Sequence, residues 1–118
     1  MAIEIQNELG IEGFAYDMMV GCSASTFGIS NAYCDIKAGK SSRVLVISPE
    51  ITSGHNNFKN RDGHFIFGDI CTAAVIEKNS QSKNKFKILD TKLKTSFSNN
   101  IRNNYGYMNA VEDKEYTE

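Results

Sequence analysis

The chain contains no tryptophan and a single proline, Pro49, among its 118 residues. It also has no excess of one charge. The formal net charge is −1, which gives no electrostatic reason to expect nucleic acid or an anionic membrane as a partner. No apolar run approaches the roughly 18 residues that a membrane span needs. The 41% apolar composition therefore fits one modest domain with its own core.

Cysteine is scarce as well, with only Cys22, Cys34 and Cys71. Three widely spaced cysteines do not make a disulfide framework. The first six residues lack the basic start and long apolar core of a signal peptide. We therefore expect a reducing cytoplasm, in which these thiols stay free.

The segment around Cys22 is the most informative part of the chain. An apolar run at residues 14–20 leads into Gly21 and Cys22, and small polar residues at 23–26 are candidate helix caps. The pattern predicts a buried strand, a sharp turn carrying the thiol, and a helix start. The partial positive charge and unpaired N–H groups at a helix N-terminus favour a nucleophilic thiolate. The arrangement resembles the strand–nucleophile–helix elbow of hydrolases, with sulfur in place of oxygen.

The other patterns predict an alternation of helices and strands. Helices are expected at residues 3–10 and 23–38, and strands at residues 14–20, 43–48, 71–77 and 86–97. The first two strands and the helix between them would form a right-handed βαβ unit, with Pro49 ending the second strand. We expect one partial domain over residues 1–118, with an ordered core at about 3–97 and a polar tail at 98–118.

Several candidate groups have plain structural explanations. Cys34 and Cys71 are expected to pack in the core. The Asp69 carboxylate is expected to cap a turn rather than to act as a general base. His55 and His64 join no cysteine pair at zinc spacing, so we expect no metal site.

Residues 16–24 resemble the nucleophile segment of beta-ketoacyl-acyl-carrier-protein synthase III, a condensing enzyme of the thiolase fold. The register holds without a gap through the strand at 44–47, Arg61-Asp62-Gly63 and Phe67-Gly68-Asp69 to the apolar run at 73–76. The resemblance implies an α/β, layered, thiolase-like fold with a mixed β-sheet and a buried central helix. The chain would form an incomplete part of its N-terminal half.

The same resemblance implies a reaction and its participants. Cys22 would accept an acyl group from an acyl-coenzyme A for decarboxylative condensation with malonyl-acyl-carrier protein in fatty acid biosynthesis. Arg61 would pack near the coenzyme A head group, and Ile66 and Phe67 would line the acyl and pantetheine channel. Acyl-coenzyme A would be a substrate, with no resident cofactor. Acyl carrier protein and a second copy of the chain, in a homodimer, would be the partners.

The sequence also departs from the family pattern. Ile70-Cys71-Thr72 stand where the family has Gly-Ala-Gly, so larger side chains should narrow or reshape the channel. The family's catalytic histidine and asparagine belong to a C-terminal half, and His55 and His64 match neither. We therefore expect no full condensation by these 118 residues. Two alternatives stay open: another thiolase-fold acyltransferase, of polyketide or transfer-only type, that shares Cys22, or a non-catalytic fragment.

Overall fold

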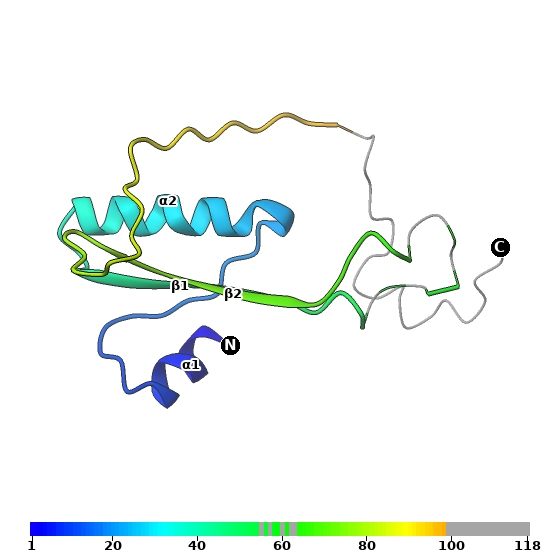
Figure 1. Ribbon diagram of the computed structural model, residues 1–118, viewed down its shortest axis with the longest axis horizontal. Helices are drawn as coiled ribbons and strands as arrows, with labels where there is room; N and C mark the ends of the chain where they lie inside the picture. Colours follow the sequence, from blue (N-terminus) through cyan, green and yellow to red (C-terminus); the bar gives the residue numbers. More distant parts are fainter. Residues whose placement is uncertain (55, 57, 60, 62–63, 99–118) are drawn as a thin grey trace.

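The computed structural model describes residues 1–54, 56, 58, 59, 61 and 64–98. In chain order the elements are α1 (Ala2–Glu8), the 3-10 turn η1 (Gly21–Ser23), α2 (Ala24–Lys37), β1 (Arg43–Glu50) and β2 (Ile70–Glu77). Helix α2 runs along one side of the two strands, and α1 lies on the other side in this view (Figure 1). The described residues therefore form a small α/β arrangement centred on the contact between α2 and β1.

The two strands pair antiparallel over eight residue pairs, in which Val46 faces Ala74 and Ser48 faces Thr72. Paired side chains share one face of a sheet. A Cβ atom added at Gly28 of α2 would lie 3.0 Å from Cγ1 of Val46, so this face is the one that α2 covers. On the opposite face of β2, Cys71, Ala73 and Val75 are exposed.

Helix α2 makes its close approach through small side chains. Its buried residues are Gly28, Ser30 and Ala32, and Ala32 is only 2% exposed. The helix ends at Lys37, and Gly39, two residues later, has a φ of +73°, the left-handed conformation that commonly follows a helix C-terminus. The predicted helix at 23–38 is thus confirmed to within one residue at each end.

The predicted strand at residues 14–20 is wrong. The segment has no strand conformation, and within the described part of the chain it makes no backbone hydrogen bond to β1 or β2. It crosses instead from α1 to the start of α2 (Figure 1). Because an apolar run reports burial but not pairing, the sequence could not exclude this outcome. The expected βαβ unit is therefore not formed, and the neighbour of β1 is the antiparallel β2.

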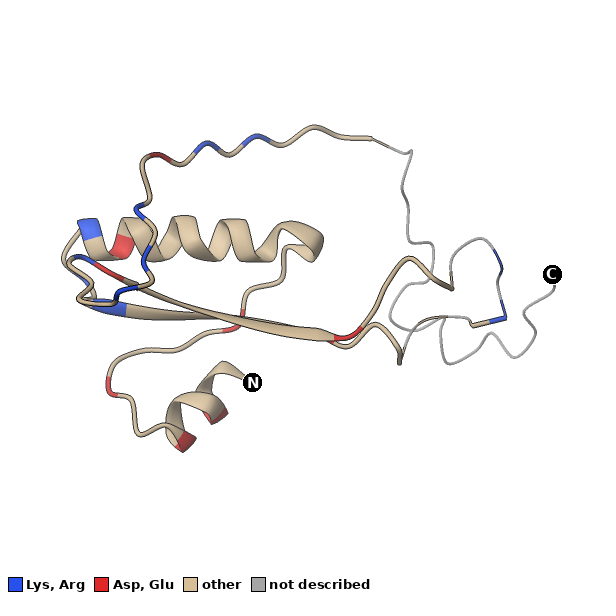
Figure 2. Ribbon diagram, in the orientation of Figure 1, with Lys and Arg blue, Asp and Glu red and all other residues tan. Residues whose placement is uncertain are grey.

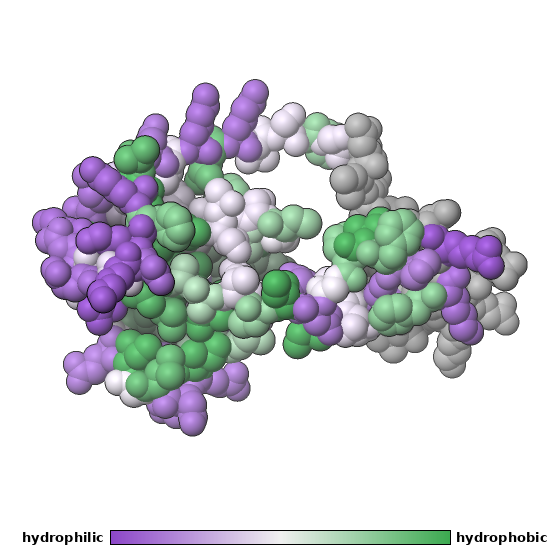
Figure 3. Space-filling view, viewed as in Figure 1, coloured by the Kyte–Doolittle hydropathy of each residue, from purple (hydrophilic) through white to green (hydrophobic). Residues whose placement is uncertain are grey.

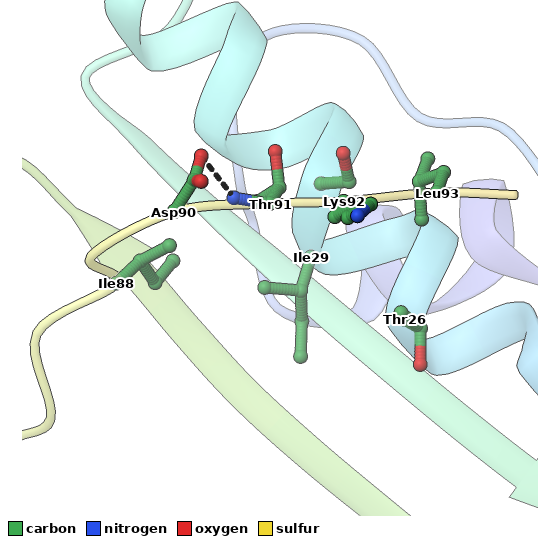
Figure 4. Close-up of a pocket in the computed structure, with 8 residues that line it drawn as sticks. Thr26, Ile29, Ile88, Asp90, Thr91, Lys92 and Leu93 are labelled. Atoms are coloured by element: carbon green, nitrogen blue, oxygen red, sulfur yellow. Dashed lines mark hydrogen bonds between the residues drawn. The ribbon is translucent and has the colours of Figure 1, made fainter.

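The predicted strand at 86–97 is wrong as well. This segment is extended without a partner strand and passes over α2 (Figure 1). Ile88 and Leu93 face Thr26 and Ile29 of α2 across a small pocket of about 240 Å³ (Figure 4). Two of the apolar residues, Ile88 and Leu93, thus lie against a helix rather than forming one face of a sheet, while Phe86, Leu89 and Phe97 are exposed.

Two smaller corrections concern single residues. Pro49 does not end β1 but pairs with Cys71 inside the ladder. Both strands of a two-stranded sheet are edge strands, where proline is tolerated. Cys34 and Cys71 are exposed rather than packed in the core. For Cys71 the reason is that no described element covers the face of β2 that carries it.

The remaining elements agree with the sequence. The helix predicted at 3–10 is α1, followed by Gly10 at a φ of +61°, and the strand predicted at 71–77 is β2. Within the described ranges, no helix is long and apolar enough to cross a membrane. The predicted polar tail from residue 99 onward lies outside the described residues, so the domain limits stay a prediction.

Candidate functional site

Cys22 lies at a bend between the segment at 14–20 and α2. It is the middle residue of η1, it is exposed, and α2 begins two residues later. Gly21 adopts a φ of +65°, and no atom lies within 4 Å of the place where its Cβ would stand. The predicted turn and the predicted helix start therefore both occur at the thiol.

The thiol borders a groove of about 1060 Å³. Residues 11–20 line one side of this groove and residues 40–50 line the other, with Ile70 and Thr72 at the start of β2. Apolar side chains gather around α1 and the segment that follows it (Figure 3). An exposed cysteine beside a partly apolar groove can meet the carbonyl of an acyl substrate.

The surroundings of Cys22 carry no charge along the chain. Residues 18–34 contain no Asp, Glu, Lys or Arg, and α2 shows charged residues only near its C-terminal end (Figure 2). The N–H of Ala24, the first residue of α2, already donates to the carbonyl of Gly21, so the local chain offers a developing anion mainly the partial positive charge at this helical start.

The nearest acidic residue along the chain, Asp17, is engaged elsewhere. Its carboxylate accepts hydrogen bonds from the amino group of Met1 and from the N–H of Ala2, both at 3.0 Å. The hydrogen bond from the amino group is the main reason that the pKa of Asp17 lies below its ordinary value. Asp17 therefore holds the start of α1 and is not placed as a general base for Cys22.

The serine and threonine residues at the start of α2 do not act as predicted. Ser23 makes no side-chain capping hydrogen bond. Ser25 instead donates its hydroxyl to Oγ of Ser48 on β1 at 2.7 Å, and both serines line the groove with Cys22. A hydroxyl at the helix start is visible in the sequence, but its partner, in a strand 23 residues away, is not.

Arg61, Ile66 and Phe67 lie in the connection between β1 and β2, and all three are exposed. None of them lines the groove that contains Cys22. The structure therefore does not bring these three residues together with the thiol, and their roles in substrate binding stay predictions.

The base of that connection is closed by polar contacts. Asp69 accepts hydrogen bonds from the N–H of Ser53 at 2.8 Å and from its hydroxyl at 2.5 Å, and Thr52 donates to the carbonyl of Gly68 at 2.9 Å. The hydroxyl of Ser53 is the main cause that lowers the pKa of Asp69. Asp69 thus joins the two ends of the connection through Ser53, 16 residues away, rather than capping a turn of its own as predicted.

The histidines show no sign of a metal centre in the described ranges. The carbonyl of His64 accepts a hydrogen bond from Asn56 at 2.8 Å, and its ring meets Phe65 edge-on at 5.4 Å. No group of three metal-binding side chains occurs among the residues with described positions. His55 lies outside them.

Comparison with known proteins gives one family and several relatives. The family model of 3-oxoacyl-[acyl-carrier-protein (ACP)] synthase III matches residues 16–96. A beta-ketodecanoyl-[acyl-carrier-protein] synthase of Pseudomonas aeruginosa is 50% identical over 115 residues, which cover 96% of this chain and 33% of that protein. A beta-ketoacyl-[acyl-carrier-protein] synthase III of Brucella anthropi is 43% identical over 77 residues, 64% of this chain and 24% of the relative.

A solved structure is similar as well. The beta-ketoacyl-[acyl carrier protein] synthase III of Thermus thermophilus superposes with a TM-score of 0.64 at 30% identity, over 68% of this chain and 25% of that one. The chain thus spans about a third or less of the length of these proteins.

Proposed function

The chain belongs to the 3-oxoacyl-[acyl-carrier-protein] synthase III family, and on that premise we propose that it carries the acyl-accepting half of a condensing reaction in fatty acid biosynthesis. Family membership and the likeness to the solved relative confirm the resemblance and the thiolase-like α/β fold inferred from the sequence. The observation that carries the proposal is the exposed thiol of Cys22, which stands at the start of α2 beside the groove.

In the proposed first step the thiolate of Cys22 attacks the carbonyl carbon of an acyl-coenzyme A. A bond forms between that carbon and Sγ, the bond to the coenzyme A sulfur breaks, and coenzyme A leaves as a thiolate that takes up a proton. The tetrahedral intermediate carries a negative oxygen. Backbone N–H groups at the start of α2 are the donors that would stabilise it.

In the second step malonyl-acyl-carrier protein loses carbon dioxide, and its carbanion attacks the acyl group on Cys22. The carbon–sulfur bond breaks, the thiol is restored, and a 3-oxoacyl-acyl-carrier protein is released. The resemblance places the histidine and asparagine for this step in a C-terminal half. We therefore propose that this chain accepts an acyl group by itself and that condensation needs that further part.

The acyl group is proposed to be medium in length. The 50% identical relative is named for a beta-ketodecanoyl product. Ten carbons in that product consist of an eight-carbon acyl group and the two carbons that a malonyl unit keeps. Ile70 and Thr72, at positions where the resemblance expects small residues, line the groove and would contact such a chain.

The remaining participants follow the family resemblance. We propose that Arg61 contacts the coenzyme A nucleotide and that Ile66 and Phe67 contact its pantetheine arm, because these exposed side chains offer one cation and two apolar surfaces. The coenzyme A thioester is a substrate, and no resident cofactor is required. The three free thiols support a cytoplasmic location. The uncovered face of β2 supports a homodimer.

The test is acyl transfer from radiolabelled octanoyl- and acetyl-coenzyme A to the chain. We expect label on Cys22, and its loss in Cys22→Ala by at least about 100-fold. The matched control is Cys71→Ala, which removes an exposed thiol outside the groove and should leave the label intact.

Two results would point to the alternatives. A folded chain that takes no label would be the non-catalytic fragment. A longer protein that takes label on the cysteine but does not release carbon dioxide from malonyl-acyl-carrier protein would be a transfer-only acyltransferase.

A further inference from the structure

We propose that Ser25 and Ser48 are positioning residues for Cys22, and that their hydrogen bond fixes the direction in which the thiol is presented to the groove. The inference rests on the proposed role of Cys22 as the nucleophile. It concerns two hydroxyl groups that act through the backbone and do not themselves touch the reacting atoms.

The first observation is the place of the hydrogen bond. Ser25 follows Cys22 by three residues and lies in the first turn of α2, and Ser48 lies near the end of β1. The two Oγ atoms are 2.7 Å apart in a half-buried setting, the usual length for a hydroxyl pair. A directional bond therefore joins the turn after the thiol to the sheet.

The second observation is the nature of the other contact between α2 and β1. It passes through Gly28, where a Cβ would meet Val46 at 3.0 Å. Such a contact between a glycine and an aliphatic side chain sets how close the elements lie, but it has little directional preference. The serine pair supplies the direction, because a hydrogen bond weakens steeply when its angle changes.

The chain before Cys22 is also held on α2. The methyl carbon of Met18 lies 3.6 Å from the position of a Cβ at Gly28, and its sulfur accepts a hydrogen bond from Asn31 at 3.7 Å. Cys22 therefore stands between two anchored residues, Met18 before it and Ser25 after it. Loss of the hydrogen bond to Ser48 would remove the anchor at Ser25 and leave only the one at Met18.

The positioning role does not require the serine pair to stabilise the fold. Replacing both partners of a hydrogen bond by apolar groups of similar shape can be nearly neutral, because no polar group is then left unpaired. A structural role would show as a loss of stability with no change in how Cys22 reacts, whereas a positioning role predicts the reverse.

The experiment uses the 118-residue chain and the variants Ser25→Ala, Ser48→Ala and the double variant. With octanoyl-coenzyme A, each single variant should lower the maximal acylation rate by about threefold to tenfold at an unchanged half-saturating concentration. The double variant should be no slower than the slower single variant, since both remove the same bond. Ser25→Thr keeps the hydroxyl and should restore the rate.

A second readout does not depend on acyl transfer. The rate at which N-ethylmaleimide modifies Cys22, relative to Cys34 in the same molecule, should change by at least about threefold in each single alanine variant. Thr26→Ala is the matched control, because it removes a neighbouring hydroxyl that does not line the groove, and it should change neither rate. If Ser25→Ala does not fold, Ser48→Ala gives the same comparison.

The outcomes separate this inference from the proposed function. An unchanged maleimide ratio, additive single variants, or an equal effect of Thr26→Ala would overturn the positioning role. If the parent chain takes no acyl label while the maleimide ratio still changes as expected, the acyl-accepting function fails and the positioning of the thiol stands.

Discussion

Two regions of the molecule are built in different ways. One is the side that holds Cys22, and the other is the connection between β1 and β2. On the first side, α2 packs on β1 through Gly28, whose Cβ position lies 3.0 Å from Val46. In the second, polar contacts such as that from Ser53 to Asp69 close the base, while aromatic residues stay exposed, with Phe65 at 70%. One region is held by packing and the other by hydrogen bonds open to water.

This difference separates the two halves of the proposed site. The nucleophile lies at an exposed bend whose neighbouring residues are held by packing at Gly28 and by the hydrogen bond between Ser25 and Ser48, and a reacting atom requires such a defined position. The residues assigned to coenzyme A lie where few apolar contacts restrain the chain, and such regions open at low free-energy cost. A substrate would thus meet a thiol beside packed elements and, in the connection, the exposed side chains of Arg61, Ile66 and Phe67.

The largest expected effect is a loss of packing in the first region. Gly28→Leu should destabilise the chain by about 1–3 kcal/mol, because a side chain must enter a space where even a Cβ approaches Val46 closely. Urea unfolding measures the change. Gly54→Ala in the connection, where nothing lies within 4 Å, should cost little or stabilise by about 0.4–1 kcal/mol. An equal loss of unfolding free energy in Gly28→Leu and Gly54→Ala would contradict the difference in packing between the two regions.

The second expected effect lies where the two regions meet, at Ile70. Ile70→Ala should lower acylation by octanoyl-coenzyme A about fivefold to tenfold and leave acetyl transfer unchanged. In a groove of about 1060 Å³ the chain has room, so the lost apolar contact outweighs any relief of crowding. Cys71→Ala, outside the groove lining, is the control, and a rise in the octanoyl rate would mean that Ile70 restricts the channel.

A third prediction concerns pH in the connection. The pKa of Asp69 is lowered, mainly by the hydroxyl of Ser53, so its contacts are strongest above the ordinary carboxyl value and are lost as pH falls through the lowered pKa. The protection factor of the Ser53 amide, which is the exchange rate of an unstructured amide at the same pH divided by its own, should fall at that pH without global unfolding. In Asp69→Asn this pH dependence should vanish. A pKa of Asp69 at or above the ordinary carboxyl value would contradict the hydrogen bonds from Ser53 that close the connection.

The smallest effect is expected at the exposed ion pair between Arg43 and Glu77, whose Nε and Oε2 atoms are 2.8 Å apart. The pKa of Glu77 is lowered first by Ser80 and second by Arg43. Arg43→Ala should therefore raise it only part of the way, with no measurable shift of the urea midpoint. Carboxyl NMR titration checks this, and Ser80→Ala should give the larger rise.

The sequence predicted best where local chemistry decides. The helix at α2 and the turn at Cys22 follow from nearby residues, namely the small residues after the thiol and Gly39 at the helix end. The strand β2 follows from a short apolar run. These features need no knowledge of which segments become neighbours in space.

The sequence failed where the answer depends on a distant partner. Residues 14–20 and 86–97 have the composition of strands, yet neither finds a strand to pair with in the described structure. Ser25 was expected to cap its own helix, and it bonds to Ser48 instead. Residue pattern predicts burial and local turns, but pairing and hydrogen-bond partners are set by the tertiary arrangement.

The bend before the thiol has a consequence of its own. Gly21 has a φ of +65° and free space around its Cβ position, so the site selects for handedness and not for size. An L-alanine placed there by chemical synthesis would be strained by about 1–2 kcal/mol, whereas its mirror-image form, D-alanine, favours this backbone angle. A semisynthetic chain with the D-residue would keep the shape of the bend that glycine, the one achiral residue of the genetically encoded twenty, supplies without steric cost.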